Sequence, residues 1–128
     1  MTPSDRRYSE THEWVKIEGD IAIVGISDYA QESLGDITFI ELPETDHNVE
    51  QEEECGVIES VKAASDLNAP IDGEIIEVND ALEGTPEIVN EDPYEAGWLF
   101  KLANFNMEQY ESLLDAVDYE ATHDHDHE

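Results

Sequence analysis

The stretch Glu59-Ser60-Val61-Lys62-Ala63-Ala64-Ser65-Asp66-Leu67 places one lysine between two short apolar runs. Lys62 is one of three lysines in a chain that carries 34 Asp and Glu residues. In so acidic a chain, we expect this lysine to serve through its amine rather than through its charge. The lysine amine is a nucleophile on a flexible four-carbon stem, and it forms a stable amide with a carboxylic acid. The stretch therefore predicts a turn between two strands that displays Lys62 as a cofactor attachment point.

Two similar stretches predict that the fold is mainly β. Residues 12–26 alternate apolar and polar side chains on both sides of Gly19, which is typical of a hairpin. Ile17-Glu18-Gly19-Asp20-Ile21 then returns, residue class by residue class, as Ile71-Asp72-Gly73-Glu74-Ile75. This repeat predicts a second hairpin that turns at Gly73. Two such hairpins indicate two antiparallel half-sheets packed face to face.

Short helices are expected around this β structure. Ser27 or Asp28 can cap a helix that ends at Gly35, and a strand is predicted over 37–42. The polar segment 45–54 predicts an exposed loop. Helical spacing of Met107, Tyr110, Leu113, Leu114 and Val117 predicts one amphipathic C-terminal helix of about three turns. We expect a carrier domain over 1–117 and a flexible acidic tail with histidines over 118–128.

The composition limits the classes of partner. A formal net charge of −29 over 128 residues repels phosphate backbones and anionic lipids, so neither nucleic-acid nor membrane binding is expected. With 39% hydrophobic residues in patterned runs, the chain is expected to fold. Self-repulsion on this scale predicts that folding depends on salt, as in a salt-adapted organism. The single cysteine, Cys55, and the lack of an apolar leader predict a cytoplasmic location.

Many short motifs follow one another in a fixed order and spacing from Tyr8 to Leu102. They are Thr11-His12-Glu13-Trp14-Val15, Val24-Gly25-Ile26-Ser27-Asp28-Tyr29-Ala30-Gln31, Leu34-Gly35-Asp36-Ile37, Glu41-Leu42-Pro43-Glu44, residues 59–67, Ala69-Pro70, Gly73-Glu74, Val78-Asn79, Val89-Asn90-Glu91-Asp92-Pro93-Tyr94 and Gly97-Trp98-Leu99. Through these motifs, and not through the lysine hairpin alone, the chain resembles the H-protein family of the glycine cleavage system.

The resemblance implies a barrel-sandwich hybrid like that of lipoyl domains, with lipoate joined by an amide to Lys62. It implies four partner enzymes. A pyridoxal-phosphate glycine decarboxylase loads an aminomethyl group, and a tetrahydrofolate-dependent aminomethyltransferase removes it. A flavin- and NAD-dependent dihydrolipoyl dehydrogenase reoxidises the dithiol, and a lipoate-attaching enzyme modifies Lys62. The carrier itself needs no catalytic residues, since the chemistry belongs to the cofactor and the partners.

Three acids of the matched stretches are candidates for supporting roles. The loaded aminomethyl group carries an amine that should be cationic near neutral pH, and a carboxylate would hold it. Glu13 and Asp66 both fall in matched stretches and are our candidates; the alternative is that both are solvated surface acids. Glu59, three residues before Lys62, is a candidate for recognition by the lipoate-attaching enzyme, with a cross-strand surface acid as the alternative.

Three positions depart from the family pattern: Asp46, Glu52 and Glu95 stand where the family usually has glycine. The turn geometry at Asp46 and Glu52 is therefore open. His12 is given no role, because a lone histidine near a strand is more often structural. His123, His125 and His127 alternate in the tail, but no metal site is expected without a fixed geometry.

Two other carrier functions compete with the shuttle. The same lysine arm would serve a relay that donates lipoyl groups to the acyltransferase subunits of 2-oxo acid dehydrogenases, and the sequence does not separate the two. A biotin carrier would resemble Met-Lys-Met, whereas Lys62 is flanked by Val61 and Ala63. An enzyme would need a convergent acid, base or nucleophile grouping, and the sequence suggests none.

Overall fold

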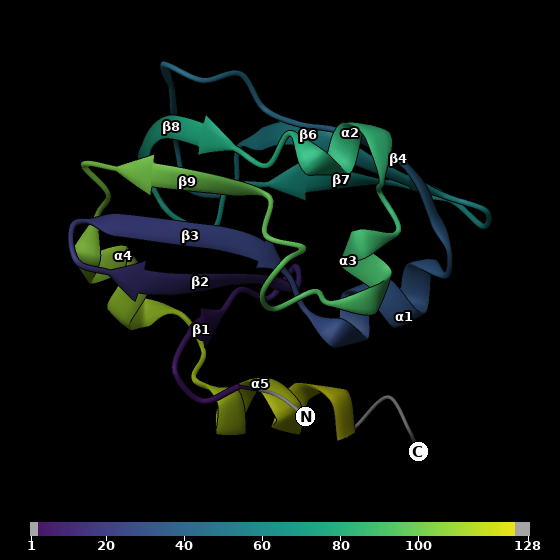
Figure 1. Ribbon diagram of the computed structural model, residues 1–128. Helices are drawn as coiled ribbons and strands as arrows, with labels where there is room; N and C mark the ends of the chain where they lie inside the picture. Colours follow the sequence, from purple (N-terminus) through teal and green to yellow (C-terminus); the bar gives the residue numbers. More distant parts are fainter. Residues whose placement is uncertain (1–2, 125–128) are drawn as a thin grey trace.

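The computed structural model describes residues 3–124, and it contains two antiparallel β-sheets with short helices around them (Figure 1). The larger sheet has the order β1-β2-β3-β9-β8-β5, and the smaller has the order β4-β6-β7. The strands of the larger sheet are β1 (Arg7–Tyr8), β2 (Glu13–Glu18), β3 (Ile21–Ile26), β9 (Phe100–Ala103), β8 (Gly73–Val78) and β5 (His47–Val49). Those of the smaller are β4 (Ile37–Glu41), β6 (Glu54–Ser60) and β7 (Ala64–Asn68).

The main core lies between the two sheets. Val24 and Phe100 of the larger sheet belong to the same buried cluster as Ile40, Ile58 and Leu67 of the smaller sheet. Burying one such side chain stabilises the fold by about 1.5–3 kcal/mol. Each sheet covers the apolar face of the other, which would otherwise be exposed to water. The prediction of a mainly β fold with two packed antiparallel sheets is confirmed.

The hairpin predicted over residues 12–26 forms as β2 and β3. Glu18 pairs with Ile21, which leaves Gly19 and Asp20 as a two-residue turn. Gly19 has φ 61°, which suits the first position of a type II′ turn. Glycine adopts this backbone without the steric cost that a Cβ would bring.

The second predicted hairpin, at Gly73, is wrong. Residues 69–72 instead carry the chain from the small sheet to the large one, and Gly73 begins β8, where it pairs with Val49 of β5. A Cβ at Gly73 would lie 3.0 Å from Leu102 Cβ, so the glycine permits close packing against β9. The match with residues 17–21 therefore reflects residue type and not a repeated turn.

Three short helices lie between the strands: α1 (Asp28–Leu34), α2 (Ala81–Gly84) and α3 (Ile88–Glu91). Helix α1 begins and ends as predicted. The Ser27 hydroxyl caps it by accepting a hydrogen bond from Ala30 N, and Gly35 ends it with φ 79°.

The single C-terminal helix predicted from Met107 to Val117 is wrong, because two helices form: α4 (Met107–Ser112) and α5 (Ala116–Asp124). Leu114, between them, exchanges two backbone hydrogen bonds with Tyr8, at 2.8 and 2.9 Å. Asp115 then starts α5, since its carboxylate accepts from Asp118 N.

Residues 118–124 also differ from the flexible tail that we expected. They belong to α5, and Tyr119 is buried against Tyr8 with its ring stacked at 4.5 Å. Residues 125–128, which include His125 and His127, lie outside the described part of the chain. No helix among the described residues is long and apolar enough to cross a membrane.

The segment expected to be a loop over 45–54 contains the short strand β5, whose Val49 is buried. Asp46 and Glu52 adopt φ values of 62° and 71°. Both positions therefore keep a left-handed, glycine-like backbone although neither is glycine.

Candidate functional site

Lys62 lies in the turn between β6 and β7, which projects from one end of the molecule (Figure 1). The Ser60 hydroxyl accepts hydrogen bonds from Lys62 N and Ala63 N, both at 3.2 Å, and donates to Ala63 O at 3.1 Å. Ser60 N also donates to Ala63 O at 2.8 Å. The turn is thus closed by its own residues, and the Lys62 side chain is exposed.

The turn is also fastened to the end of helix α1. Val61 N donates to Asp36 O at 3.0 Å. The Lys62 stem lies beside Gly35, where a Cβ would come within 3.2 Å of Lys62 Cε. Asn90 in turn holds Gly35 through a hydrogen bond from its side-chain amide to Gly35 O at 2.8 Å. This arrangement fits a lysine that carries a covalent group: the attachment point is fixed while the amine stays accessible.

Glu13, at the start of β2, is a buried acid with only 2% of its surface exposed. Its carboxylate accepts hydrogen bonds from the hydroxyls of Ser9, at 2.7 Å, and Thr11, and a longer one of 3.4 Å from Asn68 N. Burial raises the pKa of Glu13, and the hydrogen bonds from Thr11, Ser9 and Asn68 partly offset that rise. Within residues 3–121, where side chains are described, no Lys or Arg forms an ion pair with it. A buried carboxylate without a cation favours binding one.

Asp66 and Glu59 are exposed residues of the small sheet. Asp66 lies on β7 opposite Val57, and Glu59 lies on β6 between Phe39 and Ala64. Asn68, whose backbone meets Glu13, is two residues beyond Asp66 on β7, or roughly 7 Å along the strand. Glu13 and Asp66 therefore both lie close to Asn68, although no described hydrogen bond or ion pair joins the two acids. Asn68 is six positions beyond Lys62, which limits the separation of their α-carbons to roughly 20 Å.

A hydrogen-bonded network that the sequence did not predict joins His12, the residue before Glu13, to Tyr119 and Ser27. His12 Nδ1 is 2.7 Å from the Tyr119 hydroxyl, which is 2.5 Å from the Ser27 hydroxyl. His12 itself has φ 76°, and its carbonyl accepts from Ser27 N at 2.9 Å. Helix α5 is thereby joined to the segment that carries Glu13. The sequence did not predict supporting roles for Ser9, Thr11 and Tyr119. Ser9 and Thr11 stand at alternate positions before Glu13, and this spacing of hydroxyls is the signal that points to those two.

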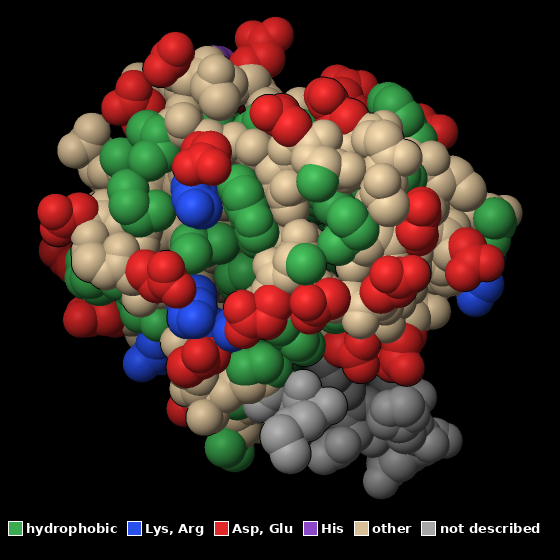
Figure 2. Space-filling view, in the orientation of Figure 1, with side chains coloured by type: hydrophobic (Ala, Val, Ile, Leu, Met, Phe, Trp, Pro, Cys, Tyr) green, Lys and Arg blue, Asp and Glu red, His purple; other side chains and the backbone are tan. Residues whose placement is uncertain are grey.

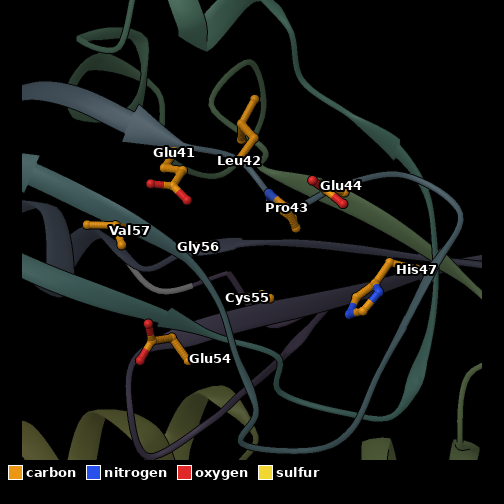
Figure 3. Close-up of a pocket in the computed structure, with 9 residues that line it drawn as sticks. All are labelled: Glu41, Leu42, Pro43, Glu44, His47, Glu54, Cys55, Gly56 and Val57. Atoms are coloured by element: carbon orange, nitrogen blue, oxygen red, sulfur yellow. The ribbon is translucent and has the colours of Figure 1, made fainter.

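No described hydrogen bond joins Cys55 to a base, and its surroundings suppress the thiolate. Burial raises its pKa to about 12, with smaller contributions from Glu13, Glu53 and Glu54. The residue lines an open cavity of about 300 Å³ between the β4–β5 segment and β6 (Figure 3). Three of its nine lining residues are acids, namely Glu41, Glu44 and Glu54. Acidic side chains are also spread over the visible surface, where few Lys or Arg side chains appear (Figure 2).

Comparison with known proteins gives one consistent family. Residues 6–126 match the family model described as glycine cleavage H-protein. A glycine cleavage system H protein of Thermus thermophilus is 55% identical over 118 residues, which cover 92% of each chain. A probable glycine cleavage system H protein of Natronomonas pharaonis is 54% identical, covering 93% of this chain and 94% of that one.

A solved structure gives the same result. The crystal structure of a glycine cleavage system H protein from Mycobacterium marinum superposes with a TM-score of 0.86 at 41% identity, covering 94% of this chain and 98% of that one. The predicted barrel-sandwich architecture is therefore confirmed, and Lys62 is exposed on a hairpin of this fold. This chain belongs to the glycine cleavage H-protein family, the lipoyl-bearing shuttles of the glycine cleavage system.

Proposed function

We propose that Lys62 carries lipoate as an amide and that this arm moves an aminomethyl group between the enzymes of the glycine cleavage system. The observation that carries the proposal is the exposed amine on a turn that is closed by Ser60 and fastened at Asp36. Attachment joins Lys62 Nζ to the acyl carbon of an activated donor. The bond from that carbon to the donor's leaving group breaks, the leaving group departs, and the amine proton goes to solvent.

When bound, the lipoyl group supplies a dithiolane that accepts an aminomethyl group and ends as a dithiol. The partners are a pyridoxal-phosphate glycine decarboxylase, a tetrahydrofolate-dependent aminomethyltransferase, a flavin- and NAD-dependent dihydrolipoyl dehydrogenase and a lipoate-attaching enzyme. Tethering keeps the group at roughly millimolar effective concentration at each partner. We propose that the chain has no catalytic activity of its own and works in the cytoplasm of a salt-adapted organism.

Glu13 is the chain's proposed holder for the cationic amine of the loaded group. Its carboxylate is buried, it is oriented by two hydroxyls, and no described cation pairs with it. A charge-assisted hydrogen bond to such a group is worth about 1.5–3 kcal/mol. Asp66, exposed on β7, is the weaker candidate, because solvent screens its charge. Glu59 is proposed to contact the lipoate-attaching enzyme.

Reconstitution with the purified partners tests the function. Lipoylated protein should support glycine-dependent exchange of carbon dioxide by the decarboxylase, and Lys62→Arg should abolish this activity while the protein stays folded. Transfer of the lipoyl group from Lys62 to an acyltransferase subunit, with no exchange activity, would instead establish the relay and overturn the shuttle.

A further inference from the structure

The outer face of the small sheet forms an ordered surface beside Lys62. Phe39, Glu59 and Ala64 pair across β4, β6 and β7, and Glu41, Val57 and Asp66 pair in a second row. All six are exposed or half-buried, whereas Ile40, Ile58 and Leu67 of the same strands face the core. The first row reads apolar, acidic, apolar, and the second reads acidic, apolar, acidic. We call these six residues the outer face.

Large apolar side chains gather near the lysine. Phe39 is 49% exposed and Val61 is 67% exposed, and they are two of only five large hydrophobic side chains exposed among the described residues. Phe39 lies directly opposite Glu59, three residues before Lys62, and Val61 precedes the lysine. Single exposed apolar residues are ordinary, but two of them close to the same exposed lysine turn point to a contact surface.

The outer face continues into a hollow. Glu41 and Val57 of the second row also line the cavity of about 300 Å³, together with acids from both of its sides, Glu44 and Glu54 (Figure 3). From Ser60 to Glu54 the surface follows all seven residues of β6, or roughly 20 Å. Apolar groups interleaved with carboxylates over this length suit a partner with apolar side chains and Lys or Arg between them.

The occupant follows from the reach of the lysine. An enzyme that acylates Nζ must bring its reaction centre within the four-carbon stem of Lys62, whereas an enzyme that acts on the far end of the finished arm stays farther from the turn. A stable interface buries about 800 Å² per partner, more than a two-residue turn offers. The acylating enzyme must therefore rest on the surface beside the turn.

We propose that the outer face, with Phe39 as its anchor, is the docking surface for the enzyme that attaches the acyl group to Lys62. The proposal rests on the proposed function, since it requires Lys62 to be acylated, and it extends the role of Glu59 to the whole face. The partner presents an apolar pocket for Phe39 and basic groups for Glu41, Glu59 and Asp66. Its binding weakens as salt screens these charges.

The test measures kcat/KM for lipoylation of the full chain by its host's acylating enzyme, supplied with the activated acyl donor. Phe39→Ala should lower kcat/KM about tenfold through KM, as expected of a central apolar anchor. Glu59→Gln should lower it severalfold and flatten its salt dependence. The matched controls are Ile76→Ala, an exposed apolar residue of β8, and Glu111→Gln, an exposed acid of α4; both should stay within about twofold.

A competition arm separates docking from chemistry. The Lys62→Arg protein should inhibit lipoylation of the wild type, and adding Phe39→Ala to it should remove most of that inhibition. Equal rates for wild type and Phe39→Ala, with folding verified by circular dichroism, would overturn the docking surface alone. So would a loss confined to carbon dioxide exchange by protein that is already lipoylated, because it would assign the face to the decarboxylase. A wild-type chain that never accepts an acyl group at Lys62 would instead overturn the proposed function.

Discussion

At the scale of single residues, Glu13 and Lys62 have different proposed roles toward the same lipoyl arm. Lys62 is exposed and supplies an attachment point. Glu13 is buried among Ser9, Thr11 and Asn68, and its raised pKa records the cost of a charge removed from water. A cation brought to Glu13 repays that cost, which is why we assign the loaded amine to it.

Glu13→Gln should accelerate hydrolytic loss of the loaded aminomethyl group by at least about tenfold, because a charge-assisted hydrogen bond is lost. Lipoylation of Lys62 should be unchanged. Since the carboxyl pKa is raised, Glu13 takes up its proton at higher pH than an exposed acid does as the pH falls. The advantage of wild type over Glu13→Gln should therefore shrink as the pH falls through that pKa.

The measurement is the release rate of labelled aminomethyl group against pH. Glu10→Gln, an exposed acid of the preceding segment, is the control and should behave as wild type. Equal release rates of the aminomethyl group from wild type and Glu13→Gln at every pH would show that Glu13 does not bind the loaded amine.

Glu52→Gly should raise the free energy of unfolding by about 0.5–1 kcal/mol. Glu52 has φ 71°, where a Cβ costs about 1–2 kcal/mol, and the greater freedom of glycine in the unfolded chain returns about 0.4–1 kcal/mol of that gain. Denaturant unfolding at fixed salt measures the change. Glu52→Ala keeps the Cβ and should give no such gain; an equal gain from both variants would refute the backbone explanation.

At the scale of elements, helix α5 connects the C-terminal part of the chain to the Glu13 segment. Its Tyr119 ring stacks on Tyr8, and its hydroxyl joins His12 to Ser27. The helix is therefore part of the carrier domain for residues 116–121 at least, where burial is described.

Tyr119→Phe keeps the stacked ring but removes the hydroxyl shared by His12 and Ser27. We expect it to destabilise the protein by about 1–2 kcal/mol, because the buried Ser27 and the half-buried His12 lose a hydrogen bond. Val117→Ala, on the exposed side of the same helix, should change stability by less than about 0.5 kcal/mol. Equal effects of the two substitutions on denaturant unfolding would mean that the network contributes nothing.

The sequence predicted those elements whose signals are local. Ser27 and Gly35 mark the two ends of α1, and Gly19 marks the β2–β3 turn, because caps and tight turns depend on their own few residues. The sequence-based prediction was wrong where contacts between distant segments determine the local structure. Leu114 fits a helix by spacing, yet it pairs with Tyr8, more than 100 positions away. Gly73 resembles Gly19 in its neighbours, but Leu102 fixes it in a strand. The burial of Glu13 was equally invisible, since Asn68 lies on another sheet.

At the scale of the whole molecule, charge is the dominant feature. A formal net charge of −29 is carried on a single pair of packed sheets, with acids spread over the surface (Figure 2). Mutual repulsion of these carboxylates opposes the compact state and favours approach of cationic partner surfaces.

The melting temperature should rise from low salt to 1 M KCl, because the screening length falls to about 3 Å and the repulsion is removed. Circular dichroism against temperature measures it, with a neutral osmolyte of equal osmolarity as the control. A melting temperature that is flat or falls with KCl would contradict salt adaptation.

The central claim is that Lys62 carries a lipoyl group. The most direct test is the intact mass of the protein isolated from its native host, followed by mapping of the peptide that contains residues 59–66. We predict a mass increase of one lipoyl group, located on Lys62. A chain whose Lys62 is unmodified in cells that lipoylate other proteins, or whose adduct lies on Lys16 or Lys101, would contradict the account.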